Sequence, residues 1–192
     1  MVSAIRYFAV LLLGTASALA QLDLSAQVTT RELEGVTFRE LRFRDGKVQV
    51  SYEPPLGWTF AGGPSRLKLA PPDMPQVDAS IEVIGPGKPT ASDESRLNMM
   101  RDAAVQNLPA GADQVNIVSQ EAAVVQVTGR NAAEVNIGYV FNGQRFMTSV
   151  ILVELTDSQL KCKMTSRAEN FPALHAAFRK SLCSFQWLPA GK

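Results

Sequence analysis

Two short turns constrain the fold of this chain more than any other feature of its 192 residues. Asp45-Gly46 and Asn142-Gly143 each lie between two strand-forming runs. Two-residue Asp-Gly and Asn-Gly loops are typical of type I′ turns, which need positive φ at both positions and join neighbouring antiparallel strands. The sequence therefore predicts two tight β-hairpins within a mostly antiparallel sheet.

Periodicity along the chain predicts further strands and two helices. Residues 146–155 are apolar on both faces from Val150 onward, which is typical of a strand that is covered on both sides. The expected fold class is therefore α+β, a central mostly antiparallel sheet with helices on both faces, as in an α/β/α sandwich. The expected strands are 37–44, 47–53, 66–70, 77–84, 114–120, 122–128, 134–141, 144–155 and 159–167, and the expected helices are 92–108 and 170–182.

The first twenty residues have the pattern of a secretory signal peptide. Arg6 supplies the positive charge, residues 7–13 form a short apolar run, and Ala18 and Ala20 are small residues at the positions that a signal peptidase reads. The run is too short to span a bilayer core of about 30 Å. We expect cleavage after Ala20, and an exported periplasmic or extracellular protein with no membrane span after cleavage.

These assignments divide the chain into three segments. Residues 1–20 are the signal peptide, residues 21–36 show no clear period and are expected to be a lead-in or a weak strand, and residues 37–188 are expected to form a single domain. The chain has 19 Lys and Arg against 18 Asp and Glu, so loss of Arg6 changes the formal net charge from +1 to 0. Neutrality gives no electrostatic case for binding nucleic acid or an anionic membrane.

The two cysteines, Cys162 and Cys183, are interpreted in the light of export. Their spacing does not match a zinc site, and exported proteins meet an oxidising environment. The leading interpretation is a structural disulfide, and the alternative is two free thiols. Strand and helix rise bring the two residues to similar heights, whereas a regular helix would turn Cys183 away from the apolar stripe that begins at Leu174.

The order of the motifs resembles the PsbP-like superfamily over residues 37–188. "YEPPLGW" (52–58) follows a strand, a helix lies in the middle of the chain, and "YVFNGQRF" (139–146) precedes a long apolar strand and the segment "ENFPALHAAFRKSLCSFQW" (169–187). The superfamily includes the PsbP-type extrinsic subunit of photosystem II and exported bacterial proteins. The resemblance implies an antiparallel sheet between helices and a non-catalytic binding, scaffold or chaperone role, and it assigns no functional residue.

Catalytic motifs are absent from the sequence. His175 is the single histidine, and no G-x-S-x-G, H-E-x-x-H, Walker or G-x-G-x-x-G pattern occurs. We therefore expect His175 to be a helix-boundary residue and the protein not to be an enzyme, with no catalytic, metal or cofactor residues assigned. A metal site assembled across the fold is left open. The carboxylates considered for it are Asp73, Asp78, Asp93, Glu94, Asp102 and Asp113.

Aromatic residues at two turns form the candidate interaction surface. Trp58 and Phe60 follow the double proline at 54–55, where core packing and a partly exposed interface are the two interpretations. Around the second hairpin, ordinary cross-strand packing is the alternative to an interaction edge. The residues at this hairpin are Tyr139, Phe141, Arg145 and Phe146.

Two functions remain open at this point. The first is a non-enzymatic interaction or assembly module of the cell envelope with a protein partner. The second is a carrier of a small apolar ligand or lipid, with a pocket between sheet and helix. A carrier requires a continuous apolar cavity, whereas an interaction module requires a filled core and an exposed aromatic patch.

Overall fold

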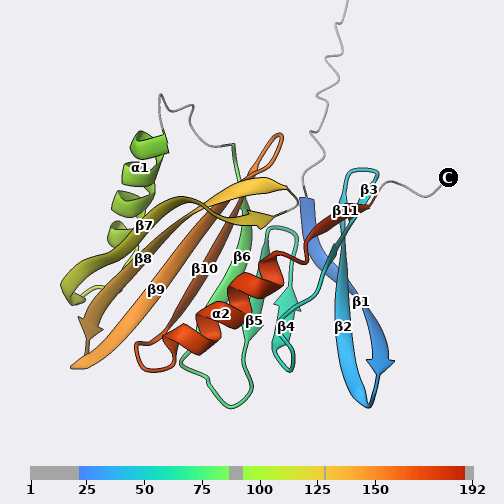
Figure 1. Cartoon of the computed structure of the whole chain (residues 1–192), viewed down its shortest axis with the longest axis horizontal. Helices are drawn as coiled ribbons and strands as arrows, with labels where there is room; N and C mark the ends of the chain where they lie inside the picture. The colour runs from blue at the N-terminus through green and yellow to red at the C-terminus, as the bar shows by residue number, and fades with distance from the viewer. Residues whose placement is uncertain (1–21, 87–92, 128, 189–192) are drawn as a thin grey trace, which may run out of the picture.

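A computed structural model describes residues 22–86, 93–127 and 129–188, so the predicted signal peptide and its cleavage site lie outside the described residues. The described chain forms two antiparallel sheets and two helices (Figure 1). The helices are α1 (Asp93–Gln106) and α2 (Phe171–Leu182). The larger sheet runs in the order β4 (Thr59–Gly62), β5 (Arg66–Ala70), β6 (Asp78–Ile84), β10 (Gln159–Arg167), β9 (Gln144–Glu154), β8 (Arg130–Phe141) and β7 (Asp113–Val127). The smaller sheet runs in the order β1 (Leu22–Leu33), β2 (Val36–Asp45), β3 (Val48–Tyr52) and β11 (Gln186–Leu188).

The two expected hairpins are present, with one correction. Asn142 and Gly143 have φ angles of 50° and 73°, the pattern of a type I′ turn, between β8 and β9. Between β2 and β3, however, Asp45 pairs with Val48, so the loop is Gly46-Lys47 rather than Asp45-Gly46. Gly46 is the one loop residue there with positive φ, which matches a turn with glycine first, as in type II′, and not type I′.

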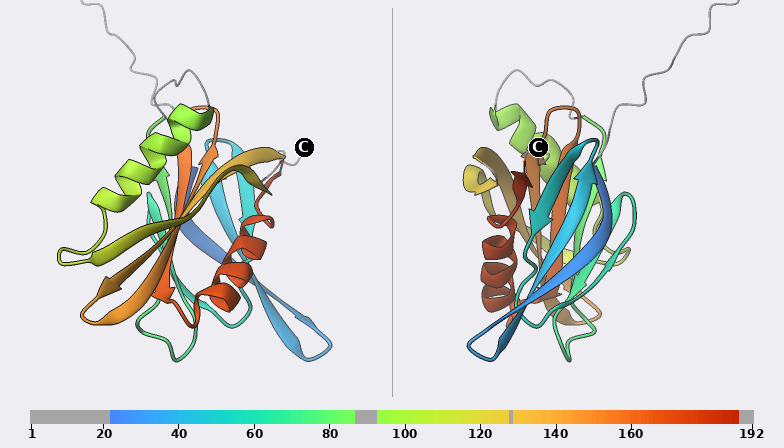
Figure 2. Two further views of the ribbon diagram at one scale, coloured as in Figure 1. Left: turned by 60° about the vertical axis from the view of Figure 1, so that its left-hand side comes forward. Right: turned by 90° about the vertical axis from the view of Figure 1, so that its right-hand side faces the viewer.

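Most of the segment 21–36, expected to be a lead-in or a weak strand, is strand β1. A third tight turn at Glu34-Gly35, with φ angles of 51° and 76°, joins β1 to β2. Leu22 and Leu24 are buried in the main core, whereas the far half of the hairpin is exposed and projects beyond the body of the protein (Figure 2). The segments 114–120 and 122–127, expected as parts of two strands, belong to the single irregular strand β7, and residue 128, the expected end of the second strand, lies outside the described residues.

The α+β class and the antiparallel pairing are confirmed, but a complete α/β/α sandwich is not formed. Ile151 and Val153 of β9 point into the main core, on the face that α2 shares with residues of the smaller sheet. Val150 and Leu152 point to the opposite face, toward α1. Figure 2 shows the two helices on either side of the larger sheet. Because α1 packs mainly on β7 and β8, it covers only part of its face.

The main core contains most of the buried aromatic residues. Phe43, Tyr52 and Phe185 stack on one another, with ring centroids 4.5–6.5 Å apart. Ser181 Oγ donates to the Phe178 carbonyl at 2.7 Å, so the Tyr52 hydroxyl donates to Ser181 Oγ at 2.9 Å. These contacts fix α2 between the two sheets.

The predicted disulfide is wrong: both cysteines are free thiols in the structure. Cys162 is buried in the main core, and burial raises the pKa of its thiol. The helix remains regular through the buried Leu182, so the next residue rotates outward. Cys183 is therefore exposed, and its thiol lies 3.7 Å from the Arg179 carbonyl. The direction in which Cys183 points from the axis of α2 therefore prevents the disulfide, even if the two residues lie at similar heights.

Candidate functional site

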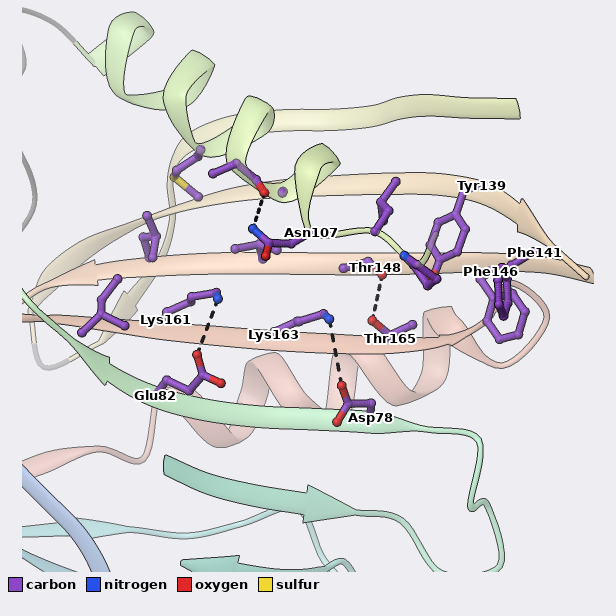
Figure 3. Close-up of a pocket in the computed structure, with 18 of the residues that line it drawn as sticks. Asp78, Glu82, Asn107, Tyr139, Phe141, Phe146, Thr148, Lys161, Lys163 and Thr165 are labelled. Carbon is purple, nitrogen blue, oxygen red and sulfur yellow. Dashed lines mark hydrogen bonds and ion pairs between the residues drawn. The ribbon is translucent and has the colours of Figure 1, made fainter. Parts of the chain in front are cut away.

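A pocket of about 760 Å³ lies between the larger sheet and α1, where the helix leaves part of the sheet uncovered (Figure 3). Its volume is within the range of about 300–1,000 Å³ that is usual for small-molecule sites. Side chains of α1, of the turn after it and of the five neighbouring strands β5, β6, β10, β9 and β8 form its walls and floor.

In the described part of the chain, one half of the pocket carries no charged residue. It is formed by α1, the following turn, β8 and β9, and every charged lining residue lies elsewhere. The residues of this uncharged half are Met100, Ala103, Ala104, Asn107, Leu108, Pro109, Tyr139, Phe141, Phe146, Thr148, Val150 and Leu152. Because most of these side chains are apolar, they favour contact with an apolar group over contact with water.

Aromatic rings close one end of this uncharged half. The Tyr139 and Phe146 rings stack at 5.8 Å, and Phe141 meets Phe146 edge to face at 6.5 Å. Tyr139 is almost fully buried, and burial raises the pKa of its phenol although a hydrogen bond with Thr148 opposes the shift. The Tyr139 side chain is therefore neutral and forms part of the wall at this end of the pocket.

The other half of the pocket is a row of charged side chains on β5, β6 and the central strand β10. Glu82 binds two cations, Arg66 at 3.1 Å and Lys161 at 3.5 Å. Lys163 approaches the half-exposed Asp78 at 4.0 Å. Figure 3 shows both lysines extending from β10 toward the carboxylates of β6. The pocket therefore has an uncharged side and a charged side that run along adjacent strands.

The residues of the candidate interaction surface predicted from the sequence lie in three different places in the structure. Tyr139, Phe141 and Phe146 meet at the pocket. Arg145 pairs across the hairpin with Val140 rather than with an aromatic residue, so its side chain points to the other face.

Trp58 and Phe60 lie away from the pocket. Trp58 is only 5% exposed, and its ring stacks on Phe178 of α2 with centroids 6.4 Å apart. Phe60, on β4, is half-buried and packs against the main core. Neither residue contributes to an exposed aromatic patch at the Pro54-Pro55 corner.

The charged side of the pocket was missed by the sequence analysis. Lys161 and Lys163 alternate with the buried residues of β10, which is typical of a solvent-facing side. The two lysines on the same face of the central strand were the one sequence signal for a charged surface. Whether that surface lines a pocket or faces solvent depends on where α1 packs.

His175 belongs to a buried polar cluster on the opposite face of the sheet. Its Nε2 lies 2.5 Å from Glu134 Oε1, and Ser149 Oγ donates to the same oxygen at 2.7 Å. Arg179 lies 3.6 Å from the second oxygen. Burial alone raises the pKa of Glu134, but the hydrogen bonds from His175 and Ser149 and the nearby positive charges together lower it below its usual range.

This cluster does not have the geometry of a catalytic triad. A triad needs a hydroxyl that is bonded to the imidazole and accessible to substrate. Here the hydroxyl of Ser149 is fully buried, and it donates to the carboxylate that also binds His175. The cluster connects α2 to β8 and β9.

No three His, Cys, Asp or Glu side chains of residues 22–86, 93–127 and 129–188 gather closely enough to hold a metal ion. Within the same part of the chain, no helix combines the length and the apolar character needed to cross a membrane.

Comparisons with known proteins give similarity at the level of structure. No family model and no curated protein sequence matches the chain. LpqN of Mycobacterium tuberculosis, a protein involved in cell envelope biogenesis, has a TM-score of 0.50 at 16% identity, over 86% of this chain and 92% of LpqN. The cyanobacterial PsbP protein (CyanoP) of Synechocystis sp. PCC 6803 has a TM-score of 0.47 at 12% identity, over 90% and 95% of the two chains.

A third structure is the T6SS immunity protein TplEi of Pseudomonas aeruginosa, with a TM-score of 0.47 at 14% identity. It matches over 78% of this chain and 48% of TplEi. At such identities the likeness concerns the fold alone. The chain therefore shares an overall fold with LpqN.

Proposed function

We propose that the chain is an exported, non-enzymatic binding protein of the cell envelope that holds a small ligand with an apolar part between its larger sheet and α1. The observation that carries the proposal is the pocket of about 760 Å³, one half of which carries no charged residue. The aromatic residues of the second hairpin form its end wall. The uncharged half of the pocket supports a carrier, and we therefore rank the carrier above the interaction module.

Export and family membership are parts of this proposal that rest on the sequence. The pattern of residues 1–20 supports export, and the motifs from residue 52 to residue 187 support membership of the PsbP-like superfamily. LpqN, which has the same overall fold, is involved in cell envelope biogenesis. An envelope location for this chain is consistent with that role of LpqN.

A non-enzymatic role is supported by the position of the reactive groups. His175 and Ser149 are bound to Glu134 on the face of the sheet opposite the pocket. The described pocket lining contains no histidine, cysteine or serine, and its two carboxylates, Asp78 and Glu82, are held in ion pairs with Lys163, Arg66 and Lys161.

Filling the pocket provides the test of the proposal. The neutral fluorescent probe N-phenyl-1-naphthylamine should bind the mature protein and brighten as it leaves water. Ala103 is exposed and lines the pocket, so Ala103→Trp places an indole in the space without disturbing the core. We expect this variant to bind the probe at least about fivefold more weakly.

Ala176→Trp is the matched control, because Ala176 is an exposed alanine on α2 and is not part of the pocket. It should leave probe binding unchanged. Equal binding by wild type and both variants, or no binding by the wild type, would overturn the proposed pocket.

A protein-binding role is the second candidate, and it rests on the projecting hairpin of β1 and β2. Val28, Leu33 and Val36 are exposed large apolar residues on this hairpin. Two-stranded ribbons alone are marginally stable in water. If the hairpin binds a partner in the envelope, a Leu33→Asp, Val36→Asp double variant should lose that partner in affinity capture but keep the binding of the naphthylamine probe. Loss of both, or of neither, would contradict a separate docking role for the hairpin.

A further inference from the structure

The distribution of charge in the pocket identifies the part of the ligand that its charged side recognises. Among the described residues, the five charged residues that line the pocket lie on β5, β6 and β10, and none lies on α1, β8 or β9. They are Arg66, Asp78, Glu82, Lys161 and Lys163. Three cations thus face two carboxylates, so the charged side has a local excess of one positive charge.

The lengths of the ion pairs show which of the three cations is least neutralised by a carboxylate. Glu82 is shared between Arg66 and Lys161 at 3.1 and 3.5 Å. The pair between Lys163 and Asp78 is longer, at 4.0 Å, and the Asp78 side chain is 55% exposed. Exposed pairs of this kind are weak because water and salt screen them. Lys163 is therefore the cation best able to exchange its present contact for a ligand.

The surroundings of Lys163 combine polar and apolar contacts. Lys163 pairs across the sheet with Val150, whose side chain faces α1. Thr165, two residues along the same face of β10, shares a hydrogen bond of 2.8 Å with Thr148. A ligand headgroup at Lys163 would thus find hydroxyl groups beside it, and the path from Lys163 over Val150 leads onto the uncharged half of the pocket.

From this arrangement we infer that the pocket binds a single-chain anionic amphiphile, with its carboxylate or phosphate headgroup at Lys163 and Lys161 and its alkyl chain along α1. Hydrogen bonds to an ionised group are roughly twice as strong as those between neutral groups. The inference rests on the proposed function, because it specifies the ligand of the same pocket.

Four dodecyl compounds, used below their critical micelle concentrations, test this assignment by displacement of N-phenyl-1-naphthylamine. Dodecyl phosphate and dodecanoate carry the two anionic headgroups, dodecyl maltoside is neutral, and dodecyltrimethylammonium is cationic. We expect at least one anionic compound to bind about tenfold more tightly than the neutral one, and the cationic compound to bind most weakly. The two anionic compounds then distinguish phosphate from carboxylate.

Variants of the lysines assign the headgroup to its position. Lys163→Met keeps an apolar stem of similar length but removes the charge, so it should weaken binding of the preferred anion by about tenfold and binding of the neutral dodecyl maltoside much less. Lys180→Met, at an exposed position on α2, is the matched control and should have no effect. Asp78→Asn removes the competing carboxylate and should strengthen binding of the anion, a gain that misfolding could not produce.

The outcomes separate the two proposals. Probe binding in the pocket without preference for anionic headgroups would overturn this inference and leave the proposed function intact. Equal losses in Lys163→Met and Lys180→Met would overturn it as well. Failure of the probe to bind, or to respond to Ala103→Trp, would overturn the proposed function itself.

Discussion

Replacing Trp58 by alanine is expected to lower the free energy of unfolding by about 3–5 kcal/mol, as is usual for a buried large aromatic residue. Trp58 is 5% exposed and stacks almost parallel on Phe178 of α2, with 6° between the ring planes. Its backbone N–H donates to the Pro55 carbonyl at 3.0 Å, which holds the corner in place. Truncation would leave a cavity between this corner and α2.

Denaturant unfolding of Trp58→Ala and of Phe178→Ala measures the effect, and the double variant should show coupling of roughly 0.5–1.5 kcal/mol between the two rings. In a Trp187→Phe background Trp58 is the single tryptophan, since the sequence has two. Its fluorescence should then be blue-shifted and poorly quenched. A small loss of stability together with red-shifted, readily quenched emission would contradict burial of Trp58.

Replacing Glu134 by alanine should also be costly, by about 3 kcal/mol or more, because it removes the acceptor of a buried polar cluster. Glu134 is 3% exposed and accepts hydrogen bonds from His175 and Ser149. The alanine variant leaves both donors without their acceptor. Glu134→Gln keeps the shape and one carbonyl acceptor, and it should cost less.

The stabilising effect of Glu134 should depend on pH. The folded chain lowers the pKa of this carboxyl, so the folded state binds protons less readily than the unfolded state. The stability it contributes is therefore complete above the unfolded value of about 4.3 and is lost as the pH falls toward the folded value and below it. The stability difference between wild type and Glu134→Gln should narrow from about pH 5 to pH 3.

Urea unfolding of the two proteins across this range provides the measurement. Asp23, whose pKa is also lowered by hydrogen bonds from Ser25, is present in both proteins and cancels in the difference. A difference that stays constant, or widens as the pH falls, would contradict the assigned charge state of Glu134.

Much of the fold could be predicted from local sequence. Strand β10 alternates cleanly and has the predicted bounds, and the turn at Asn142-Gly143 has the predicted positive φ angles. These features depend on neighbouring residues, whose periodicity and turn chemistry act locally. Strand β1 was expected only as a lead-in or a weak strand, because its second half is mostly polar and is exposed on both faces, although Leu22, Leu24 and the Glu34-Gly35 turn were usable signals.

The pocket could not be predicted in the same way. Whether Lys161 and Lys163 face solvent or line a pocket depends on the position of α1, which is far away in sequence and packs on β7 and β8. The cysteines illustrate the same limit. The rise per residue along the strand and the helix predicted that the two cysteines lie at similar heights. In the structure, α2 continues through Leu182, so Cys183 points outward.

The most direct measurement of the pocket is an NMR experiment that locates a bound alkyl chain on the mature protein. With methyl-labelled protein and dodecyl phosphate, intermolecular nuclear Overhauser effects should join the alkyl chain to the methyl groups of Met100, Val150 and Leu152, which line the pocket on α1 and β9. Contacts confined to the exposed Val28, Leu33 and Val36 of the projecting hairpin, with none to the three pocket residues, would contradict a ligand site between the larger sheet and α1.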